Sequence, residues 1–213
     1  MSEWVWHDQR MSPRPSMTES RRRDILIATA IAIAERGLCE TRIADVADIV
    51  GVSPALVLYY FPTKTALLAE ALIHLDRVFY DRVAAKLATA TSAEDRLVIL
   101  IEESCPRPAK AGELPDSWAL WPATWEMARL DPELAAARAR LDEAWRAQIV
   151  AIVEDGIATG EFVGVDSKDF SIQLASMLDG MAMEAMLGDP TVDADRMSQL
   201  ARSFARTMLK SRV

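Results

Sequence analysis

The residues best suited to chemistry lie between Thr41 and Lys64, in the run TRIADVADIVGVSPALVLYYFPTK. Arg42 and Lys64 stand where helices are predicted to begin, and cations at such positions commonly reach phosphate oxygens. A further helix is predicted to begin at Ser53, where free backbone N–H groups and a partial positive charge favour anions. The run therefore indicates recognition of a phosphate backbone rather than bond making or breaking.

Two short helices joined by a tight turn must position these groups. Helices are predicted over residues 42–50 and 53–60, because Gly51 permits the turn and Pro54 follows a predicted N-cap, Ser53. Ala47 is expected to face inward where the helices cross, and Val52 to fill the small core beneath the turn. This pattern is typical of a helix-turn-helix, with a plain helical corner as the alternative. The predicted DNA-binding residues are Thr41, Arg42, Ser53, Pro54, Ala55, Leu56, Tyr59, Tyr60 and Lys64.

A second group of candidate residues is aromatic. Trp118, Trp121 and Trp125 recur at spacings of three and four residues, which places them on one face of a helix. Such a face predicts a pocket for an aromatic, amphipathic or cationic molecule, with a core stripe as the alternative. Glu126 or Asp142 would select a cation there, unless both are simply solvated. The predicted ligand-binding residues are Trp121, Trp125, Met127, Trp145 and Met177.

Residues for catalysis or metal binding are sparse. The two histidines, His7 and His74, are far apart in sequence, and the two cysteines, Cys39 and Cys105, lack a C-x-x-C spacing. The 8 glycines are scattered, so no phosphate-binding loop is expected. We therefore predict no enzyme activity, no metal site and no cofactor.

The composition fits a globular protein. Hydrophobic residues make up 51% of the 213 residues and charged residues 26%. The longest apolar run, 25–34, is shorter than the roughly 20 residues that a membrane span needs. The first ten residues lack the basic-then-apolar order of a secretory signal. We expect a cytoplasmic protein without a membrane partner.

The charge is unevenly distributed along the chain. A net charge of −8 by itself argues against nucleic acid, because an acidic surface repels DNA. Residues 10–64, however, hold 8 basic and 6 acidic side chains, whereas residues 65–213 hold 16 basic and 24 acidic ones. The acidity therefore belongs mainly to the C-terminal part. A basic arm with Arg10, Arg14 and Arg21 to Arg23 is expected to add affinity for DNA.

Helical periodicity and helix breakers predict an all-α fold with about nine helices. In the helix predicted over 167–187, apolar residues exceed one stripe and include Met177, Gly180, Met181, Ala182, Met183, Ala185 and Met186. Part of this helix is therefore expected to bury against something besides its own domain, with a fully buried helix in a monomer as the alternative. The predicted helices are 18–36, 42–50, 53–60, 64–88, 92–104, 118–129, 132–159, 167–187 and 193–210.

Residues Arg22 to Leu72 resemble the DNA-binding domain of the tetracycline-repressor (TetR) family of transcriptional regulators. The matching residues, in order and without a gap, are Ala34-Glu35-Arg36-Gly37, Thr41, Val46-Ala47, Gly51-Val52-Ser53 and Phe61-Pro62-Thr63-Lys64. The chain departs from the family at Ala55, where Gly is usual, and at Leu58, where Tyr is usual. Leu58 cannot donate a phenolic hydrogen bond to phosphate. Scattered C-terminal positions, including Asp131-Pro132-Glu133-Leu134, Gly160-Glu161-Phe162 and Leu178-Asp179-Gly180, resemble the BetI-type subgroup.

The resemblance implies an arm over residues 1–17, a helix-turn-helix domain over 18–66 and a ligand-sensing and dimerisation domain over 67–213. It implies a ligand-responsive regulator that binds a palindromic DNA operator as a homodimer through its last helices. A repressor released by a small-molecule inducer is the main expectation. The alternatives are a helical protein-interaction scaffold without DNA binding and a transcriptional activator of the same family.

Overall fold

The structure is a computed structural model that describes residues 17–37, 40–106, 118 and 121–209. These residues form nine α-helices and no strand, which confirms the predicted fold class. Helix ends differ from the predicted ones by at most one residue, except at the start of α6, where the difference is three. The helices are α1 (Met17–Arg36), α2 (Ile43–Val50), α3 (Pro54–Tyr60), α4 (Lys64–Leu87), α5 (Ala93–Glu103), α6 (Trp121–Ala128), α7 (Pro132–Thr159), α8 (Ser167–Met186) and α9 (Ala194–Leu209).

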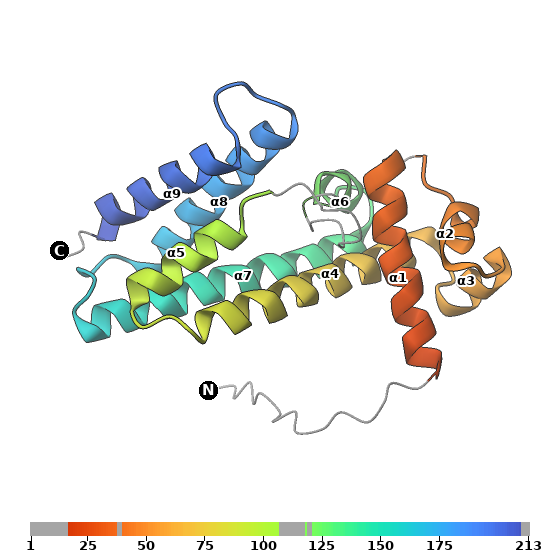
Figure 1. Cartoon of the computed structure of the whole chain (residues 1–213), viewed down its shortest axis with the longest axis horizontal. Coiled ribbons are helices and arrows are strands. Elements are labelled where there is room, and N and C mark those ends of the chain that lie inside the picture. The colour runs from red at the N-terminus through yellow and green to blue at the C-terminus, as the bar shows by residue number, and fades with distance from the viewer. Residues whose placement is uncertain (1–16, 38–39, 107–117, 119–120, 210–213) are drawn as a thin grey trace.

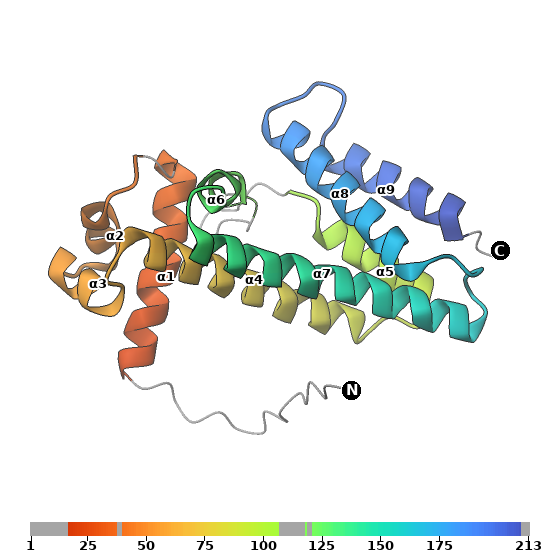
Figure 2. The same ribbon diagram turned by 180° about the vertical axis from the view of Figure 1, so that it is seen from behind.

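The helices form two regions joined by α4. Helices α1, α2 and α3 gather at one end of the molecule, while α4 and α7 run side by side away from them (Figures 1 and 2). Helices α5, α8 and α9 pack at the far end (Figure 1). We call described residues 17–75 the head and described residues 76–209 the body. The predicted N-terminal arm lies outside the described residues, apart from Met17, which begins α1.

The head has its own apolar core. Helix α1 packs against α2 and α4, and the fully buried side chains include Ile25, Val57, Phe61 and Leu72. The buried cluster extends along α4 as far as Leu75. A domain boundary at residue 66 would therefore divide this cluster, and the predicted domain limits stay a prediction.

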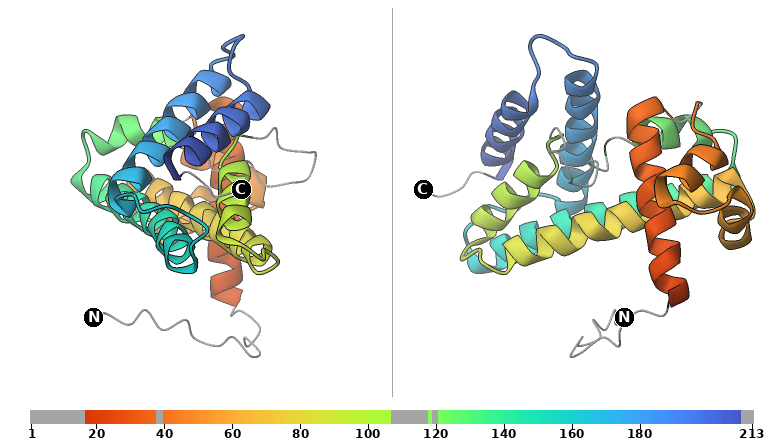
Figure 3. Two further views of the ribbon diagram at one scale, coloured as in Figure 1. Left: turned by 90° about the vertical axis from the view of Figure 1, so that its left-hand side faces the viewer. Right: turned by 45° about the vertical axis from the view of Figure 1, so that its right-hand side comes forward.

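The body has a second core, in which α8 packs between α7 and α9 (Figure 3, left). Its fully buried side chains include Leu100, Ile149, Leu174 and Met197. The Met-rich face of α8 is only partly as predicted. Met181 and Ala182 are buried in the body's own core, whereas Gly180 and Met186 are exposed.

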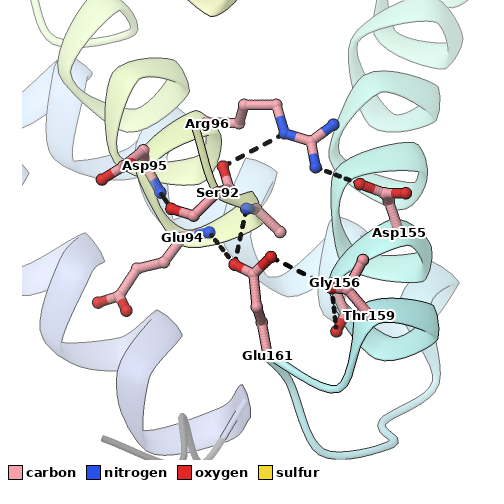
Figure 4. A network of polar contacts seen from close by, with 9 residues as sticks. Ser92, Glu94, Asp95, Arg96, Asp155, Gly156, Thr159 and Glu161 are labelled. Carbon is pink, nitrogen blue, oxygen red and sulfur yellow. Dashed lines mark hydrogen bonds and ion pairs between the residues drawn. The ribbon is translucent and has the colours of Figure 1, made fainter. Parts of the chain in front are cut away.

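A polar network holds α5 to the end of α7 (Figure 4). Gly160 ends α7 in the left-handed conformation, with a φ of 79°, and the chain turns back toward α5. The Glu161 carboxylate then accepts hydrogen bonds from the backbone N–H groups of Ala93 and Glu94, at 2.7 and 3.3 Å (Figure 4). The partial positive charge at the start of α5 favours a carboxylate at this place. Arg96 of α5 also pairs with Asp155 of α7.

Within the described ranges, no single helix is both long and apolar enough to cross a membrane. Only α2 and α3 taken together reach that length and composition, and they are sharply bent at the break between them.

Candidate DNA interface and ligand cavity

Helices α2 and α3 form the predicted helix-turn-helix. The two helices bend by 102° at the break between them, inside the range of about 90–120° typical of the motif. Gly51 ends α2 with a φ of 73°, a left-handed conformation that a residue with a Cβ rarely adopts. The backbone N–H of Val52 then donates to the Ala47 carbonyl at 2.9 Å, and Ala47 is fully buried. The small side chain of Ala47 thus lets the helices cross closely, as predicted.

The exposed face of α3 carries most of the predicted contacts. Ser53, Pro54 and Ala55 are exposed, and Leu56 is half-buried. Ser53 also caps the helix, because its Oγ accepts a hydrogen bond from the Leu56 backbone N–H at 3.2 Å. Tyr59 is 78% exposed. The start of α3 therefore presents a polar cap beside a mostly apolar surface.

Leu58 and Tyr60 differ in solvent exposure. Leu58 is 44% exposed, so an apolar side chain occupies the surface position where the family usually has tyrosine. Tyr60 is half-buried against the head core and meets the Tyr59 ring edge-on, with centroids 5.4 Å apart. Tyr59 is thus the more accessible of the two tyrosines.

The two predicted cations stand at helix starts. Arg42 is the exposed N-cap of α2, and its backbone N–H donates to Asp45 Oδ2 at 2.7 Å. Lys64 is the half-buried first residue of α4, directly after the N-cap Thr63. Both residues therefore lie at the starts of the two helices that precede and follow α3 in the chain.

The buried position of Thr41 contradicts its prediction as a DNA-binding residue. The residue is only 3% exposed, and its hydroxyl donates to the carbonyls of Gly37 at 2.8 Å and Ala32 at 3.2 Å. Its side chain therefore ties the end of α1 to the start of α2 and does not face the surface, so the prediction of a side-chain contact to DNA is wrong.

Arg22 also differs from expectation. Instead of extending as part of a basic arm, its guanidinium pairs with Glu70 and donates to the Tyr60 carbonyl at 3.3 Å. It also lies over the Phe61 ring, 4.6 Å from the centroid. Arg22 therefore fastens α1 to the end of α3 and to α4. Arg10 and Arg14 lie outside the described residues.

The body contains a cavity of about 340 Å³ between α4, α6, α7 and α8. Trp118, Trp121, Trp125 and Trp145 all line it, and all four also belong to or pack on the body core. The tryptophans therefore combine the predicted pocket wall with the core stripe that was its alternative, and their binding of a ligand stays a prediction. The Trp121 and Trp125 rings lie 6.2 Å apart, and Trp145 meets Phe79 with centroids 5.8 Å apart. The lining comprises Asp76, Phe79, Tyr80, Ser104, Trp118, Trp121, Trp125, Arg138, Leu141, Asp142, Trp145, Arg146, Ile172, Ala175, Ser176, Leu178 and Asp179.

The two predicted methionines do not line this cavity. Met127 packs on the head core, because it lies on the opposite side of α6 from Trp125. Met177 packs on the body core, one residue before the lining residue Leu178. Glu126 is exposed and also lies off the cavity wall. The prediction that Met127, Met177 and Glu126 lie at the ligand pocket is therefore wrong, whereas Asp142 lines the cavity as predicted.

Three carboxylates from three helices share the cavity. Asp76 of α4, Asp142 of α7 and Asp179 of α8 line it together with Arg138 and Arg146. Arg138 pairs with Asp142 at 2.7 Å. The local formal charge with all groups ionised is therefore −1, so the site favours a cation over an anion.

Burial changes the acidity of these groups. Burial and then the neighbouring Asp142 raise the pKa of Asp76 to about 7. The same two causes raise the pKa of Asp179 to about 6, although Arg138 and Arg146 oppose them. Burial also raises the pKa of Asp142 against the effect of the two arginines. Asp76 and Asp179 therefore gain and lose their protons close to neutral pH.

Sequence reasoning missed Asp76, Tyr80 and Asp179. Asp76 and Tyr80 are four residues apart and so share a face of α4, a spacing that marks a polar and aromatic pair on one wall. Nothing local in the sequence indicates that this face meets Asp179, 99 residues away from Tyr80. Within the described residues, no group of His, Cys, Asp and Glu side chains is arranged to hold a metal ion.

Two family models match the chain. The model described as bacterial regulatory proteins, tetR family, matches residues 25–71. The model described as BetI-type transcriptional repressor, C-terminal, matches residues 93–210. The first covers the helix-turn-helix and the second most of the cavity-forming helices.

Relatives and solved structures agree with these matches. The HTH-type transcriptional regulator BetI of Escherichia coli (strain K12) is 25% identical over 194 residues, covering 90% of this chain and 95% of the relative. A transcriptional regulator from Saccharomonospora viridis, solved in complex with choline, is 30% identical with a TM-score of 0.79, covering 89% of this chain and 96% of the other. A TetR regulator from Haloarcula marismortui is 28% identical with a TM-score of 0.76, covering 90% and 97%. This chain belongs to the TetR family of transcriptional regulators, with a C-terminal domain of the BetI type.

Proposed function

We propose that the protein is a repressor that binds a palindromic operator as a homodimer and leaves it when a small organic cation enters the body cavity. It would act in the cytoplasm, where the operator DNA is. The family gives the regulatory role, and the arrangement of the head and the cavity supports the mechanism.

The observation that carries the proposal is the course of α4. This helix begins at Lys64 beside α3, supplies head-core residues as far as Leu75, and continues directly into the cavity wall with Asp76, Phe79 and Tyr80 (Figure 3, right). From Lys64 to Asp76, twelve residues of α-helix span about 18 Å. A ligand that displaces the cavity segment of α4 therefore also moves the head, and such coupling typically amounts to ~1–3 kcal/mol.

The head supports DNA reading in the major groove. Its α3 presents a capped start, exposed Tyr59 and flanking cations, as the second helix of a helix-turn-helix does. Two heads related by a two-fold axis must lie about 34 Å apart to enter successive grooves on one side of DNA. The distance between heads is thus the property that the ligand would change.

The dimer is proposed to form through α8 and α9. Gln173, Gly180 and Glu184 of α8 are exposed, and their spacings of seven and four residues place them on one face of the helix. In the part of the chain that the structure describes, nothing lies within 4 Å of a Cβ built on Gly180, so this small residue leaves room for a close helix approach. Leu187, just after α8, is 80% exposed and adds apolar surface.

The cavity supports a cationic inducer. Aromatic faces attract cations, and the carboxylates supply the opposite charge. The relative from S. viridis was solved with choline, a quaternary ammonium compound. An amine or quaternary ammonium compound is therefore the proposed class of inducer.

Operator release tests the proposal. Binding to the intergenic DNA beside the protein's own gene is measured by fluorescence anisotropy, with choline as the first probe. We expect choline to lower the affinity for DNA in the wild type, and Trp125→Ala to remove this response while retaining DNA binding. Met127→Ala is the matched control, because Met127 lies two residues away on α6 but off the cavity. A response that survives Trp125→Ala would contradict the ligand site.

The dimer is tested by sedimentation. Gly180→Arg should yield a monomer with weak operator binding, because it inserts a charged side chain into the proposed interface. Ala151→Arg, at an exposed position of α7, is the control and should remain dimeric. A monomeric wild type would contradict this part. A reporter gene that is switched on, rather than off, by the protein would favour the activator alternative.

A further inference from the structure

One carboxylate oxygen in the cavity lacks a hydrogen-bond partner among the described residues. Asp76 is 7% exposed and lines the cavity, and among the described residues its Oδ2 has no hydrogen-bond partner. Buried polar atoms are almost always satisfied, because an unpaired one keeps the cost of losing water. A buried carboxylate oxygen left unpaired on a cavity wall is a place for a donor from outside the chain.

The other charged groups around the cavity do not compensate Asp76. Arg138 pairs with Asp142, and both Arg138 and Arg146 act on Asp142 and Asp179. The charge that acts on Asp76 is that of Asp142, which is of the same sign.

The remaining neighbours on α4 do not compensate Asp76 either. Tyr80, one turn along, is an uncharged neighbour whose pKa burial raises further. Two residues before Asp76, the pKa of His74 is lowered by burial and then by Arg77 and Arg23, which favours a neutral imidazole. A cation that balances Asp76 must therefore come with the ligand.

Resting on the proposed function of the cavity as an inducer site, we propose that Asp76 determines ligand specificity by selecting ammonium compounds with an N–H donor over quaternary ones. A protonated amine places its N–H on the carboxylate and its hydrocarbon part against the tryptophans. A quaternary nitrogen gains the ring contacts and the charge attraction but cannot make the hydrogen bond.

Binding of a protonated amine is coupled to the loss of a proton from the Asp76 carboxyl. Because burial and Asp142 raise the pKa of Asp76 to about 7, the empty cavity holds this carboxyl partly protonated near neutral pH. When a protonated amine binds, the O–H bond of the carboxylic acid breaks, its proton leaves to solvent, and the carboxylate accepts the ligand's N–H. Binding should therefore release protons below pH 7 and tighten as the pH rises through this value.

A matched pair of probes tests the inference on the full chain. Benzyldimethylamine, protonated at neutral pH, and benzyltrimethylammonium differ in whether the nitrogen bears a proton or a third methyl group. Affinities are measured by calorimetry at pH 6 and pH 8, in buffers of different ionisation heat so that proton release is read directly. We expect the protonated amine to bind the wild type about tenfold more tightly at pH 8, as one hydrogen bond to a charged group allows.

The variants separate Asp76 from the rest of the cavity. In Asp76→Asn the affinity ratio of the two probes should fall to about one, and the proton release should fall to the part that Asp179 contributes. Asp81→Asn, at an exposed position of the same helix, is the control and should keep both. A thermal melt establishes that each variant is folded.

The outcomes distinguish this inference from the proposed function. Equal affinity of the two probes for the wild type, or an unchanged ratio in Asp76→Asn, overturns the role of Asp76. If choline still releases the operator in that case, ligand-released repression stands. If neither probe binds, both the role of Asp76 and the cationic class of inducer are wrong.

Discussion

The head and the body cavity differ in how completely their polar groups are paired within the chain. In the head, Arg22 pairs with Glu70, Arg36 pairs with Asp45 at 2.6 Å, and the Thr41 hydroxyl is bonded to backbone carbonyls. Each of these contacts fixes one helix against another. In the cavity, by contrast, the Asp142 carboxylate adds to the effect of burial and raises the pKa of both Asp76 and Asp179.

This difference fits the proposed division of the chain into a DNA-reading head and a ligand-sensing body. A head that must match the spacing of DNA grooves gains from contacts that hold α3 in one orientation. A cavity whose charges are not balanced within the chain is stabilised when a ligand balances them. Helix α4 belongs to both regions, so under the proposed function it would carry a change in the cavity to the head.

The largest expected effect comes from removing the centre of the head. Phe61→Ala should destabilise the protein by about 3–5 kcal/mol, because Phe61 is fully buried and its ring lies under the Arg22 guanidinium. Operator binding should be lost, while probe binding in the cavity should survive. Chemical denaturation with calorimetry on the same sample checks this. Loss of both activities would show that the head and the body fold as one unit.

The next largest expected effect is a gain in the free energy of unfolding when Asp76 in the cavity is replaced. The folded-state pKa of Asp76, about 7, exceeds its ordinary value of 3.8, so the folded chain binds the proton more strongly than the unfolded chain. The associated stability is present below about pH 4 and is lost as the pH rises toward 7. Asp76→Asn should therefore stabilise the ligand-free protein at pH 8 by roughly 2–4 kcal/mol.

Urea denaturation at pH 5 and pH 8 checks the Asp76 prediction. The advantage of the variant over the wild type should widen between the two pH values. An advantage that is the same at both pH values would mean that Asp76 does not hold a proton in the empty cavity, and the contrast with the head would then weaken.

Two glycines of the body sharpen the comparison further. A Cβ on Gly156 of α7 would lie 2.2 Å from the Phe162 ring and 2.9 Å from Ala93, so Gly156→Ala should cost about 1–3 kcal/mol. Gly180→Ala meets nothing in the chain and should be neutral or stabilising in a monomer by about 0.5–1 kcal/mol. Thermal melts over a range of protein concentrations measure both. A cost at Gly180 that grows with concentration would support a close approach of two chains there.

The smallest expected effect concerns one cation of the head. Lys64→Ala should weaken binding to all DNA sequences alike and reduce the slope of log affinity against log salt by about one, as the loss of one phosphate contact does. Titrations at several salt concentrations, with specific and unrelated duplexes, measure this slope. An unchanged slope would remove Lys64 from the DNA interface, whereas a loss confined to the specific duplex would indicate a base contact instead.

Most of the fold follows from local sequence patterns. The caps Ser53 and Thr63 and the left-handed Gly51 and Gly160 set helix ends within one residue of their predicted positions. The start of α6 is the exception, because the periodic tryptophans continue N-terminally past the point where the helix begins at Trp121. Periodicity marks a face, and it does not by itself mark where the helix starts.

The candidate site was only partly predictable. The tryptophan spacing identified one wall of the cavity, but the same helical reasoning wrongly added Met127. A residue's side of a helix follows from its spacing, whereas what that side faces depends on how α6 lies against the head and α7. For the same reason Thr41, a good candidate for a surface contact by type and position, is in fact a buried tie between α1 and α2.

The sequence by itself determined the nine helices of the described chain, the helix-turn-helix and the family, because caps, breakers and apolar spacing act over a few residues. The tertiary structure alone decided that Asp76, Asp142 and Asp179 share one cavity and that Arg22 pairs with Glu70 of α4. Those pairings join positions 37 to 103 residues apart, and they depend on the packing angle and register of whole helices. No local pattern carries that information.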